Sequence, residues 1–508
     1  MILTQKEYIQ KVLGCWNGKN VGGNLGAPFE CARNIFEVEY YTQKLDGEPL
    51  PNDDLDLQLV WLNAAEDYGR FVNSKVLGEY WNWYITPHWG EYGAGKNNMR
   101  AGIMPPLSGK VNNVYGNSCG AFILSEIWAC LTPGHPELAV NYAYEDATVN
   151  HFGEGLYAEV FCAAIQSAAF AESDTQNLIE IGLSYIPQDC DVAKGIRCVQ
   201  EAYEDELTWQ EARKKLLIAV PGSFGALGTP REKMDPEIPV GKIGWDAPSN
   251  IGIIIIGLLY GEGNFGKSIC IAAGCGEDAD CTAGTLGSLL GIIGTTKCIN
   301  EKWLKPLGGK IKTKCINNAD VGLRLPQTVE EMTERVVALL PEFAGSSICQ
   351  CVGVSNGYVV QMDDRDKLCC KETRINSWYS KSFLDTLKQS PYVDSYNFVL
   401  FDVLVDYGEE PFIKAGKVKT FHITVINRFQ MQQWLKLKWY TTDEVNILPA
   451  KQIEASLESY YCNLGKAEFN FEITLDSLTK SKYEFLLDIS AVGHHTRGIV
   501  PIVLFASM

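Results

Sequence analysis

Two short acidic stretches hold the residues best suited to chemistry. In the first, Asn52, Asp53, Asp54 and Asp56 stand just before an apolar run of helical spacing. One Asp or Asn is enough to cap a helix start, so the further carboxylates are in excess. Adjacent carboxylates repel each other unless a cation or a shared proton neutralises them. A hard divalent cation with oxygen ligands is one interpretation, and a solvated helix cap is the other.

The second acidic stretch, residues 276–282, reads GEDADCT. Asp278 and Asp280 alternate with small residues, and Cys281 and Thr282 follow within a run of small residues. Alternate oxygen donors on one side of a turn suit a hard metal, although an acidic first helical turn is the simpler interpretation of this stretch alone. If the two stretches face each other, their oxygens can hold two Mg²⁺ or Mn²⁺ ions a few ångströms apart.

Four other segments are candidates for substrate binding. Asn24 lies in a glycine-rich segment that ends at Glu30, and glycines there allow a close approach of a helix or of a ligand. Arg100 precedes a Gly/Pro-rich loop and is suited either to a substrate anion or to a surface carboxylate. His151 and Gly153 come just before a predicted helix, where a histidine beside glycines has a structural or a binding role. The aromatic run 80–89 suits stacking on a flat ring, although such a run more often belongs to a core.

Helices are the elements that must position these residues, and helical periodicity extends to about residue 343. The spacing of apolar residues predicts helices over 58–65, 138–149, 157–171 and 329–340. The apolar run 251–260 is too short to span a bilayer and is predicted to be a buried helix. We therefore expect a multi-helix, all-α domain over residues 1–343.

From about residue 346 the periodicity becomes that of strands. Alternating or β-branched stretches, separated by turn residues, occur over 352–360, 396–405, 417–426, 435–440, 468–475 and 483–490. This pattern predicts an Ig-like β-sandwich over residues 348–508, with the boundary at 341–347. Its candidate roles are shaping the cleft, binding a carbohydrate and forming a homodimer.

Composition excludes several classes of function. The chain has 44 Lys and Arg against 62 Asp and Glu, a formal net charge of −18, which disfavours binding to nucleic acids and to anionic membrane surfaces.

The 17 cysteines are scattered, mostly in apolar runs, and lack paired C-x-x-C spacing. That usage is typical of a reduced, cytoplasmic protein without structural zinc. The first residues contain no long apolar stretch, so no secretory signal is predicted.

Taken in order, these segments resemble the ADP-ribosylglycohydrolase family over about residues 11–343. The family's glycine-rich opening motif looks like residues 18–30, its T-D-D-T looks like residues 52–55, and its late G-D-T-D-T looks like residues 276–281. The stretch 133–157 is similar to the bacterial branch of the family. The C-terminal β-region lies outside this resemblance.

The resemblance implies an all-α fold with two Mg²⁺ or Mn²⁺ ions. In the family the metals hold the ribose hydroxyls of ADP-ribose while the bond at the anomeric carbon is hydrolysed. Carried over by matching position, Glu30 is the expected acid/base residue, with Asp54 as the second catalytic carboxylate. The expected metal ligands are Asp53, Asp54, Asp278, Asp280 and the side-chain carbonyl of Asn52.

The chain also departs from the family pattern. Threonines of the family motifs are replaced by Asn52, Leu55 and Cys281, and a thiol is a softer ligand than Mg²⁺ prefers. Asp56 and Thr282 offer compensating oxygens. Three functions remain open: a metal-dependent hydrolase that cleaves the N- or O-glycosidic bond of an ADP-ribosyl group or similar small substrate, a glycosidase for a non-nucleotide sugar, and a non-catalytic ligand-binding protein on the same fold.

Overall fold

The computed structural model describes residues 1–317, 322–352, 357–370, 390–429, 431–442, 444–459 and 465–507. The chain divides into two compact units. The first comprises Met1–Asn73, Tyr84–Gly95 and the described part of Gly109–Tyr379, and the second comprises Ser74–Trp83, Lys96–Ser108 and the described part of Ser380–Met508. Two segments from the helical part of the sequence thus group with the β-rich unit, and the domain boundary expected at 341–347 stays a prediction.

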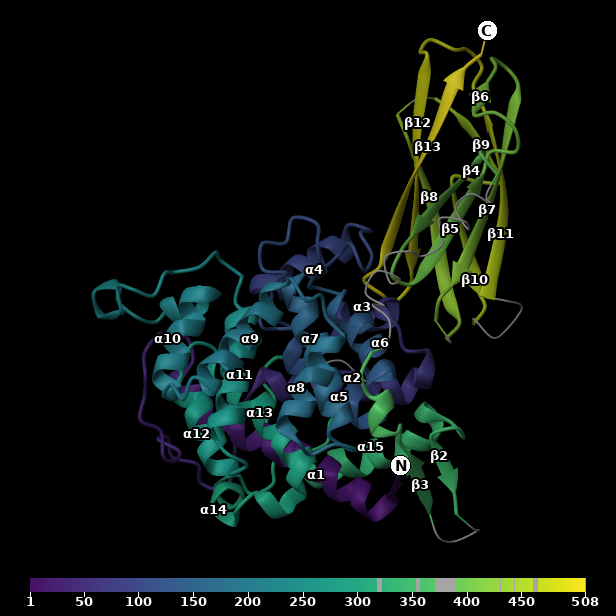
Figure 1. Cartoon of the computed structure of the whole chain (residues 1–508). Coiled ribbons are helices and arrows are strands. Elements are labelled where there is room, and N and C mark those ends of the chain that lie inside the picture. The colour runs from purple at the N-terminus through teal and green to yellow at the C-terminus, as the bar shows by residue number, and fades with distance from the viewer. Residues whose placement is uncertain are drawn as a thin grey trace. The chain divides into compact units, whose positions relative to one another are not determined.

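The predicted helical architecture is confirmed (Figure 1). Each predicted helix forms, as α2, α6, α7, α11 and α15, although α6 ends at Ala147 and α7 at Ala168, before the predicted ends at 149 and 171. The α-helices of the described residues are α1 (Gln5–Gly26), α2 (Asp53–Tyr68), α3 (Ser74–Tyr84), α4 (Gly90–Arg100), α5 (Ser125–Leu131), α6 (Pro136–Ala147), α7 (Glu154–Ala168), α8 (Thr175–Ser184), α9 (Asp191–Glu204), α10 (Trp209–Ala219), α11 (Ala247–Tyr260), α12 (Phe265–Gly274), α13 (Ala279–Gly294), α14 (Glu301–Leu304) and α15 (Val329–Ala344).

The centre of the first unit is the close packing of α1 against α13. Gly14, Gly18, Gly22 and Gly26 form one stripe of α1, and a Cβ atom added at any of them would lie 2.0–2.2 Å from a backbone oxygen of α13. The opposing residues run in reverse order, from Gly291 for Gly14 to Ala279 for Gly26. The two helices are therefore antiparallel, with no space for side chains between their backbones. This pairing brings the C-terminal end of α1 to the N-terminal end of α13.

The core around this pair is apolar and aromatic. Trp16, Trp61 and Trp128 are fully buried, and α11 is buried along almost its whole length, as predicted. None of the helices in the described residues combines the length and the apolar character needed to cross a bilayer. A small sheet of β1 (Ile2–Thr4), β3 (Tyr358–Gln361) and β2 (Cys349–Cys351) also belongs to the first unit.

The predicted C-terminal β-sandwich is confirmed as two five-stranded sheets of the second unit, whereas its Ig-like type and its bounds of 348–508 stay predictions. Part of the strand expected over 352–360 forms β3 of the small sheet instead. Trp439 of one sheet and Phe471 of the other lie in contact, with ring centroids 5.1 Å apart. One sheet has the order β10-β8-β12-β13-β6 and the other the order β4-β5-β7-β11-β9. Their bounds are β4 (Val393–Asn397), β5 (Phe401–Asp406), β6 (Phe412–Ile413), β7 (Val418–Asn427), β8 (Gln433–Thr441), β9 (Asn446–Leu448), β10 (Gln452–Leu457), β11 (Lys466–Thr474), β12 (Lys482–Ala491) and β13 (Arg497–Ala506).

Polar contacts join the α3 segment to the sandwich inside the second unit. Lys75 Nζ lies 2.8 Å from Asp402 Oδ1. One turn later the buried carboxylate of Glu79 accepts hydrogen bonds from His494 Nδ1 at 2.6 Å and from Thr496 Oγ1 at 2.7 Å. This helical segment is therefore part of the folded β-rich unit.

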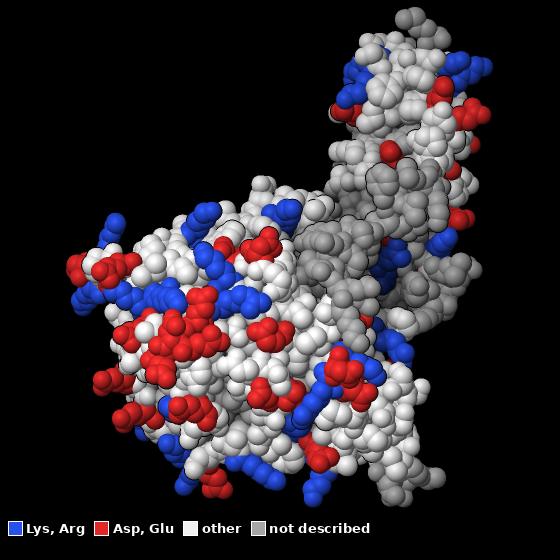
Figure 2. Space-filling view, in the orientation of Figure 1, with Lys and Arg blue, Asp and Glu red and all other residues white. Residues whose placement is uncertain are grey.

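Charge is distributed rather than concentrated on the surface that Figure 2 displays. Acidic and basic side chains are interspersed there, often next to each other. Each cysteine that the structure describes is free of a disulfide.

Candidate active site

The packing of α1 on α13 places Glu30 beside the second acidic stretch. Just after α1, Ala32 forms an antiparallel bridge with Glu277. Two backbone hydrogen bonds form this bridge, from Cys31 N to Glu277 O at 2.9 Å and from Glu277 N to Ala32 O at 2.8 Å. Asp278 and Asp280 follow at the start of α13. Residues about 250 positions apart in sequence thus share one edge of a site.

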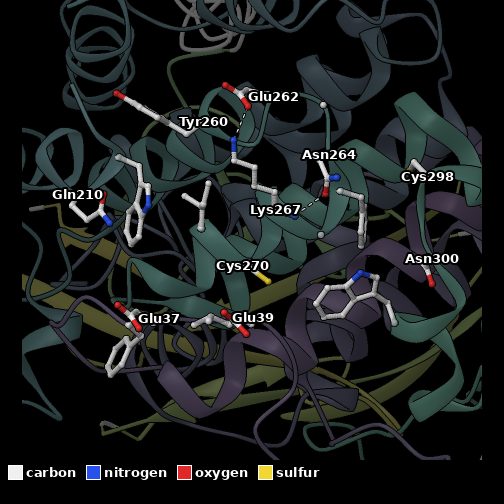
Figure 3. A pocket seen from close by; sticks show the side chains of 18 of the residues that line it. Glu37, Glu39, Gln210, Tyr260, Glu262, Asn264, Lys267, Cys270, Cys298 and Asn300 are labelled. Atoms are coloured by element: carbon white, nitrogen blue, oxygen red, sulfur yellow. Dashed lines mark hydrogen bonds and ion pairs between the residues drawn. The ribbon is translucent and has the colours of Figure 1, made fainter. Parts of the chain in front are cut away.

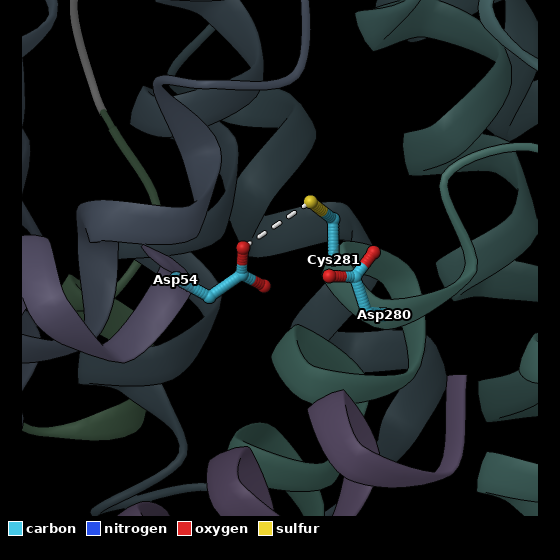
Figure 4. A group of neighbouring side chains, drawn as sticks. All are labelled: Asp54, Asp280 and Cys281. Carbon is cyan, nitrogen blue, oxygen red and sulfur yellow. Dashed lines mark hydrogen bonds between the residues drawn. The ribbon is translucent and has the colours of Figure 1, made fainter. Parts of the chain in front are cut away.

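The first acidic stretch starts α2 and faces the same point. Asn52 caps this helix, because its Oδ1 accepts a hydrogen bond from Asp54 N at 2.7 Å. The Asp54 side chain is buried and accepts a hydrogen bond from Cys281 Sγ at 3.4 Å on its Oδ1 (Figure 4). The two acidic helix starts therefore face each other.

Two groups of side chains are arranged like ligands of a cation. One group is Asp54, Asp280 and Cys281, and the other is Glu30, Asp278 and Asp280. In each group the ligand atoms lie within 4.8 Å of one another, and Asp280 belongs to both. Asp54 Oδ2 and Asp280 Oδ1 are buried oxygens with no hydrogen-bond partner. Since buried oxygens of this kind are costly to leave unpaired, the residues present fit a bound divalent cation.

The surroundings of these acids raise their pKa values. Burial, followed by neighbouring carboxylates, raises the pKa of Asp278 well above its usual range. Burial also raises the pKa of Asp54, although Lys19 acts in the opposite direction. The pKa of Asp280 rises to about 7, through burial and then the charge of Glu30. Burial and the charge of Asp53 raise the pKa of Glu30. Without a cation, these groups favour shared protons over adjacent negative charges.

A buried lysine from α1 lies behind Asp54. Lys19 Nζ is 3.1 Å from Glu126 Oε1 and 3.8 Å from Asp54 Oδ2, and all three side chains are buried. Burial alone would lower the pKa of Lys19, but the charges of Glu126 and Asp54 keep it above its usual value. A permanent positive charge therefore lies behind the acidic group.

The acids open into a cavity of about 520 Å³. Trp89, Tyr115, Leu227 and Ile243 are among its walls. Lys314 is the single lysine or arginine among its described lining residues. The Lys314 ammonium lies 3.7 Å from Asp53 Oδ1 and 5.5 Å from the centre of the Trp89 ring. The other Asp53 oxygen accepts a hydrogen bond from Tyr92 at 3.3 Å.

Three predicted substrate-binding residues lie outside this cavity and make internal hydrogen bonds. Asp56 is buried, and its Oδ2 accepts hydrogen bonds from the backbone N–H groups of Lys314 and of Cys315, the latter at 2.6 Å. Asn24 Oδ1 accepts a hydrogen bond from Leu50 N at 2.7 Å. Thr282 Oγ1 donates to a carbonyl of the same helix turn. These contacts fix the positions of backbone segments around the site.

His151 and Gly153 support one wall of the cavity. Ser118, which lines the cavity, lies with its Oγ 3.2 Å from His151 Nε2, while His151 Nδ1 is 2.6 Å from Asn150 Oδ1. Gly153 has φ +55°, which favours glycine, and directly precedes α7. The imidazole is fully buried, so it holds the wall from behind.

Arg100 and Glu277 also have positions that the sequence did not indicate. Arg100 is exposed at the end of α4, in a segment that groups with the second unit, and it is not among the cavity-lining residues described. Glu277 was one of three carboxylates in the second acidic stretch, but it forms a buried ion pair with Arg33, at 2.7 Å from Arg33 Nε. This pair holds the turn that carries Asp278.

A larger cavity of about 1210 Å³ lies elsewhere on the first unit, as Figure 3 shows. Its lining includes Trp209, Tyr260 and Trp303, together with an ion pair of 2.6 Å between Lys267 and Glu262. It contains none of the site residues predicted from the sequence.

Sequence reasoning missed two functional candidates. Lys314 lies in no motif, and long-range contacts place it at the site: a backbone hydrogen bond to Asp56 and the contacts of its ammonium with Asp53 and Trp89. Lys19 had a visible signal, because it is a charged residue at the centre of the glycine stripe of α1. A lysine in such a packed position requires a buried partner.

One protein family matches most of this chain. The family model described as ADP-ribosylglycohydrolase matches residues 4–342. No curated protein matches the chain. A solved structure described as an ADP-ribosylglycohydrolase-related protein complex is 18% identical, with a TM-score of 0.40, over 66% of this chain and 99% of that chain. Because the family model covers more than half of the sequence, this chain belongs to the ADP-ribosylglycohydrolase family.

Proposed function

We propose that this protein is a metal-dependent hydrolase that cleaves the N- or O-glycosidic bond of an ADP-ribosyl group or a similar small glycosyl substrate. The observation that carries the proposal is the pair of acidic groups that share Asp280. Asp54 and Asp280 each have a buried oxygen without a hydrogen-bond partner, and both residues line a cavity. Membership of a glycohydrolase family supports the type of reaction.

Asp53, Asp54, Asp278 and Asp280 would hold one or two Mg²⁺ or Mn²⁺ ions. When bound, such ions supply charge stabilisation and orient sugar hydroxyls and water. Asn52 is a less direct ligand candidate, because its side-chain oxygen already caps α2. The thiol of Cys281 stands where the family has a hydroxyl, and its hydrogen bond orients Asp54.

Glu30 and Asp54 are the proposed catalytic carboxyl groups. Water adds to the anomeric carbon, the bond from that carbon to the leaving nitrogen or oxygen breaks, and the leaving atom gains a proton. Glu30 suits the donation of that proton, because burial and the charge of Asp53 raise its pKa and Glu30 lines the cavity beside Asp278 and Asp280. A carboxylate on the Asp54 side of the cavity takes the proton that water loses. The products are a free sugar and the protonated leaving group.

Metal binding is the first test of this function. Titration calorimetry with Mn²⁺ and with Mg²⁺ should show binding to the wild type and a loss of at least about tenfold in affinity for Asp278→Asn, since one charged ligand is removed. Glu262→Gln is the control, because Glu262 is an exposed acid of the other cavity. Absence of binding of either ion to the wild type would overturn the proposal.

The cellular role is a further part of the proposal. We place the protein in the cytoplasm, with a small glycoside or an ADP-ribosylated molecule as its substrate and without a nucleic-acid or membrane partner. The β-sandwich would bind carbohydrate or form a homodimer. Size-exclusion chromatography with light scattering tests the last of these roles.

A further inference from the structure

The cavity carries an excess of negative charge that two metal ions do not remove. Seven carboxylates line it, against the single ammonium of Lys314: Glu30, Asp53, Asp54, Glu91, Asp246, Asp278 and Asp280. The formal charge of these side chains is −6, and two divalent ions reduce it to −2. A phosphate group that entered would meet like charge in a partly desolvated space. Lys314 is already engaged by Asp53.

The mouth of the cavity is apolar instead. The exposed fractions of the rim residues are 49% for Trp89, 37% for Tyr115, 75% for Leu227 and 68% for Ile243. Soluble proteins rarely leave large apolar side chains exposed together unless a ligand or a partner covers them. We call these four residues the apolar rim. Trp89 and Tyr115 offer flat faces on which a ring can stack.

We propose that the cavity takes an uncharged glycoside, whose flat, apolar aglycone lies on the apolar rim while its sugar hydroxyls face the acidic groups. This inference rests on the proposed function and narrows its substrate class to glycosides without a phosphate. The charge of the lining and the exposure of the rim support it independently.

Lys314 has a defined place in this arrangement. The Lys314 backbone N–H donates a hydrogen bond to Asp56, and the Lys314 ammonium contacts both Asp53 and the Trp89 ring. The lysine therefore connects the acidic inner surface with the rim, and it orients Trp89 through a cation–π contact. A phosphate-binding role would require this ammonium to leave Asp53 and face an anion.

The test compares matched ligands on the full chain saturated with Mn²⁺. The probes are para-nitrophenyl thioglycosides of ribofuranose and glucopyranose, which resist hydrolysis, each with and without a phosphate on the primary hydroxyl. Calorimetry should show that an uncharged probe binds at least about tenfold more tightly than its phosphorylated counterpart. Trp89→Ala should weaken that binding by about tenfold, and Trp89→Phe should restore most of it. Trp434→Ala, an exposed tryptophan of the β-sandwich, is the control.

The outcomes separate this inference from the proposed function. Tighter binding of a phosphorylated probe, abolished by Lys314→Met, would overturn the inference while Mn²⁺ binding still supports a metal-dependent hydrolase. Failure of every uncharged probe to bind the Mn²⁺-loaded protein would also overturn it. Failure of Mn²⁺ itself to bind would refute the proposed function. In the expected result, Lys314→Met weakens binding of the uncharged probe by no more than Trp89→Ala does, because the lysine acts on that probe through the Trp89 ring.

Discussion

Asp54 and Asp280 each keep one buried oxygen without a hydrogen-bond partner, and both belong to the groups that fit a cation. The same acids have raised pKa values because burial and neighbouring carboxylates disfavour their charged forms. A divalent ion removes both costs, since it replaces the missing partner and compensates the charge. At the scale of residues, these acids therefore fit the proposed divalent ion, whose binding would displace their protons.

The Lys19–Glu126 ion pair behind the site gives a first prediction. Lys19→Met should lower the free energy of unfolding of the metal-free protein by about 3 kcal/mol, because it leaves Glu126 charged and buried without its cation. Adding Glu126→Gln to that variant should recover part of the loss. Urea denaturation followed by circular dichroism measures both changes. A Lys19→Met variant with the stability of the wild type would contradict this account.

A second buried acidic pair gives a prediction for pH. Burial raises the pKa of Asp146 to about 7 from its ordinary 3.8, although Trp128 donates it a hydrogen bond at 2.7 Å. Burial and the nearby Asp146 also raise the pKa of Glu159. The folded state therefore retains protons that the unfolded chain loses, so stability should fall as pH rises from about 4 to about 8.

Asp146→Asn is the variant that checks this pH dependence. The amide keeps an oxygen for Trp128 and cannot ionise, so the melting temperature should depend less on pH than in the wild type. Differential scanning calorimetry between about pH 5 and about pH 8, in the presence of a chelator, gives the slope. The same slope in both proteins would show that Asp146 does not titrate as described.

At the scale of elements, the glycine stripe of α1 decides whether the acids meet. The antiparallel contact with α13 places Glu30 next to Asp278 and Asp280, and α2 supplies Asp54 from a third direction. A small separation of α1 from α13 would move ligand atoms by distances comparable to a metal–oxygen bond. Metal affinity should therefore depend on the packing of these helices.

A pair of glycine substitutions tests this dependence. Gly22→Ala puts a Cβ 2.0 Å from Ala283 O, so it should destabilise the protein by about 3 kcal/mol and weaken Mn²⁺ binding. Gly284→Ala, in the same helix pair, meets atoms no closer than 3.4 Å and should be neutral or slightly stabilising. Equal effects of the two substitutions, measured by urea denaturation and calorimetry, would contradict the proposed role of the stripe.

At the scale of the whole molecule, the two units do not follow the order of the chain. Ser74–Trp83 and Lys96–Ser108 come from the helical half of the sequence but fold with the β-sandwich. The chain therefore passes from the first unit to the second and back more than once before the C-terminal strands are made. Neither unit is a simple continuous piece of sequence.

Glu79 tests the dependence of the sandwich on this helical segment. Glu79→Ala should lower the stability of the second unit by about 2 kcal/mol, because His494 and Thr496 lose their acceptor inside the protein. Glu484→Ala is the control, because Glu484 is an exposed strand residue that pairs with Lys482. Calorimetry should show a lower melting temperature for the first variant alone. An unchanged transition would mean that the α3 segment is dispensable to the sandwich.

The sequence by itself determined the helical character of the first 343 residues, the strands of the C-terminal region and the two acidic helix starts that meet. These features are local, because periodicity, capping residues and runs of carboxylates express themselves within one or two turns. Tertiary structure alone decided which polar residues reach the cavity. Asp56, Asn24 and Thr282 make hydrogen bonds inside the protein and do not line the cavity. Lys314 lines it, and its backbone N–H donates a hydrogen bond to Asp56, 258 residues earlier in the chain. Such a choice depends on long-range packing, which places a side chain in a cavity or in the core without changing its type.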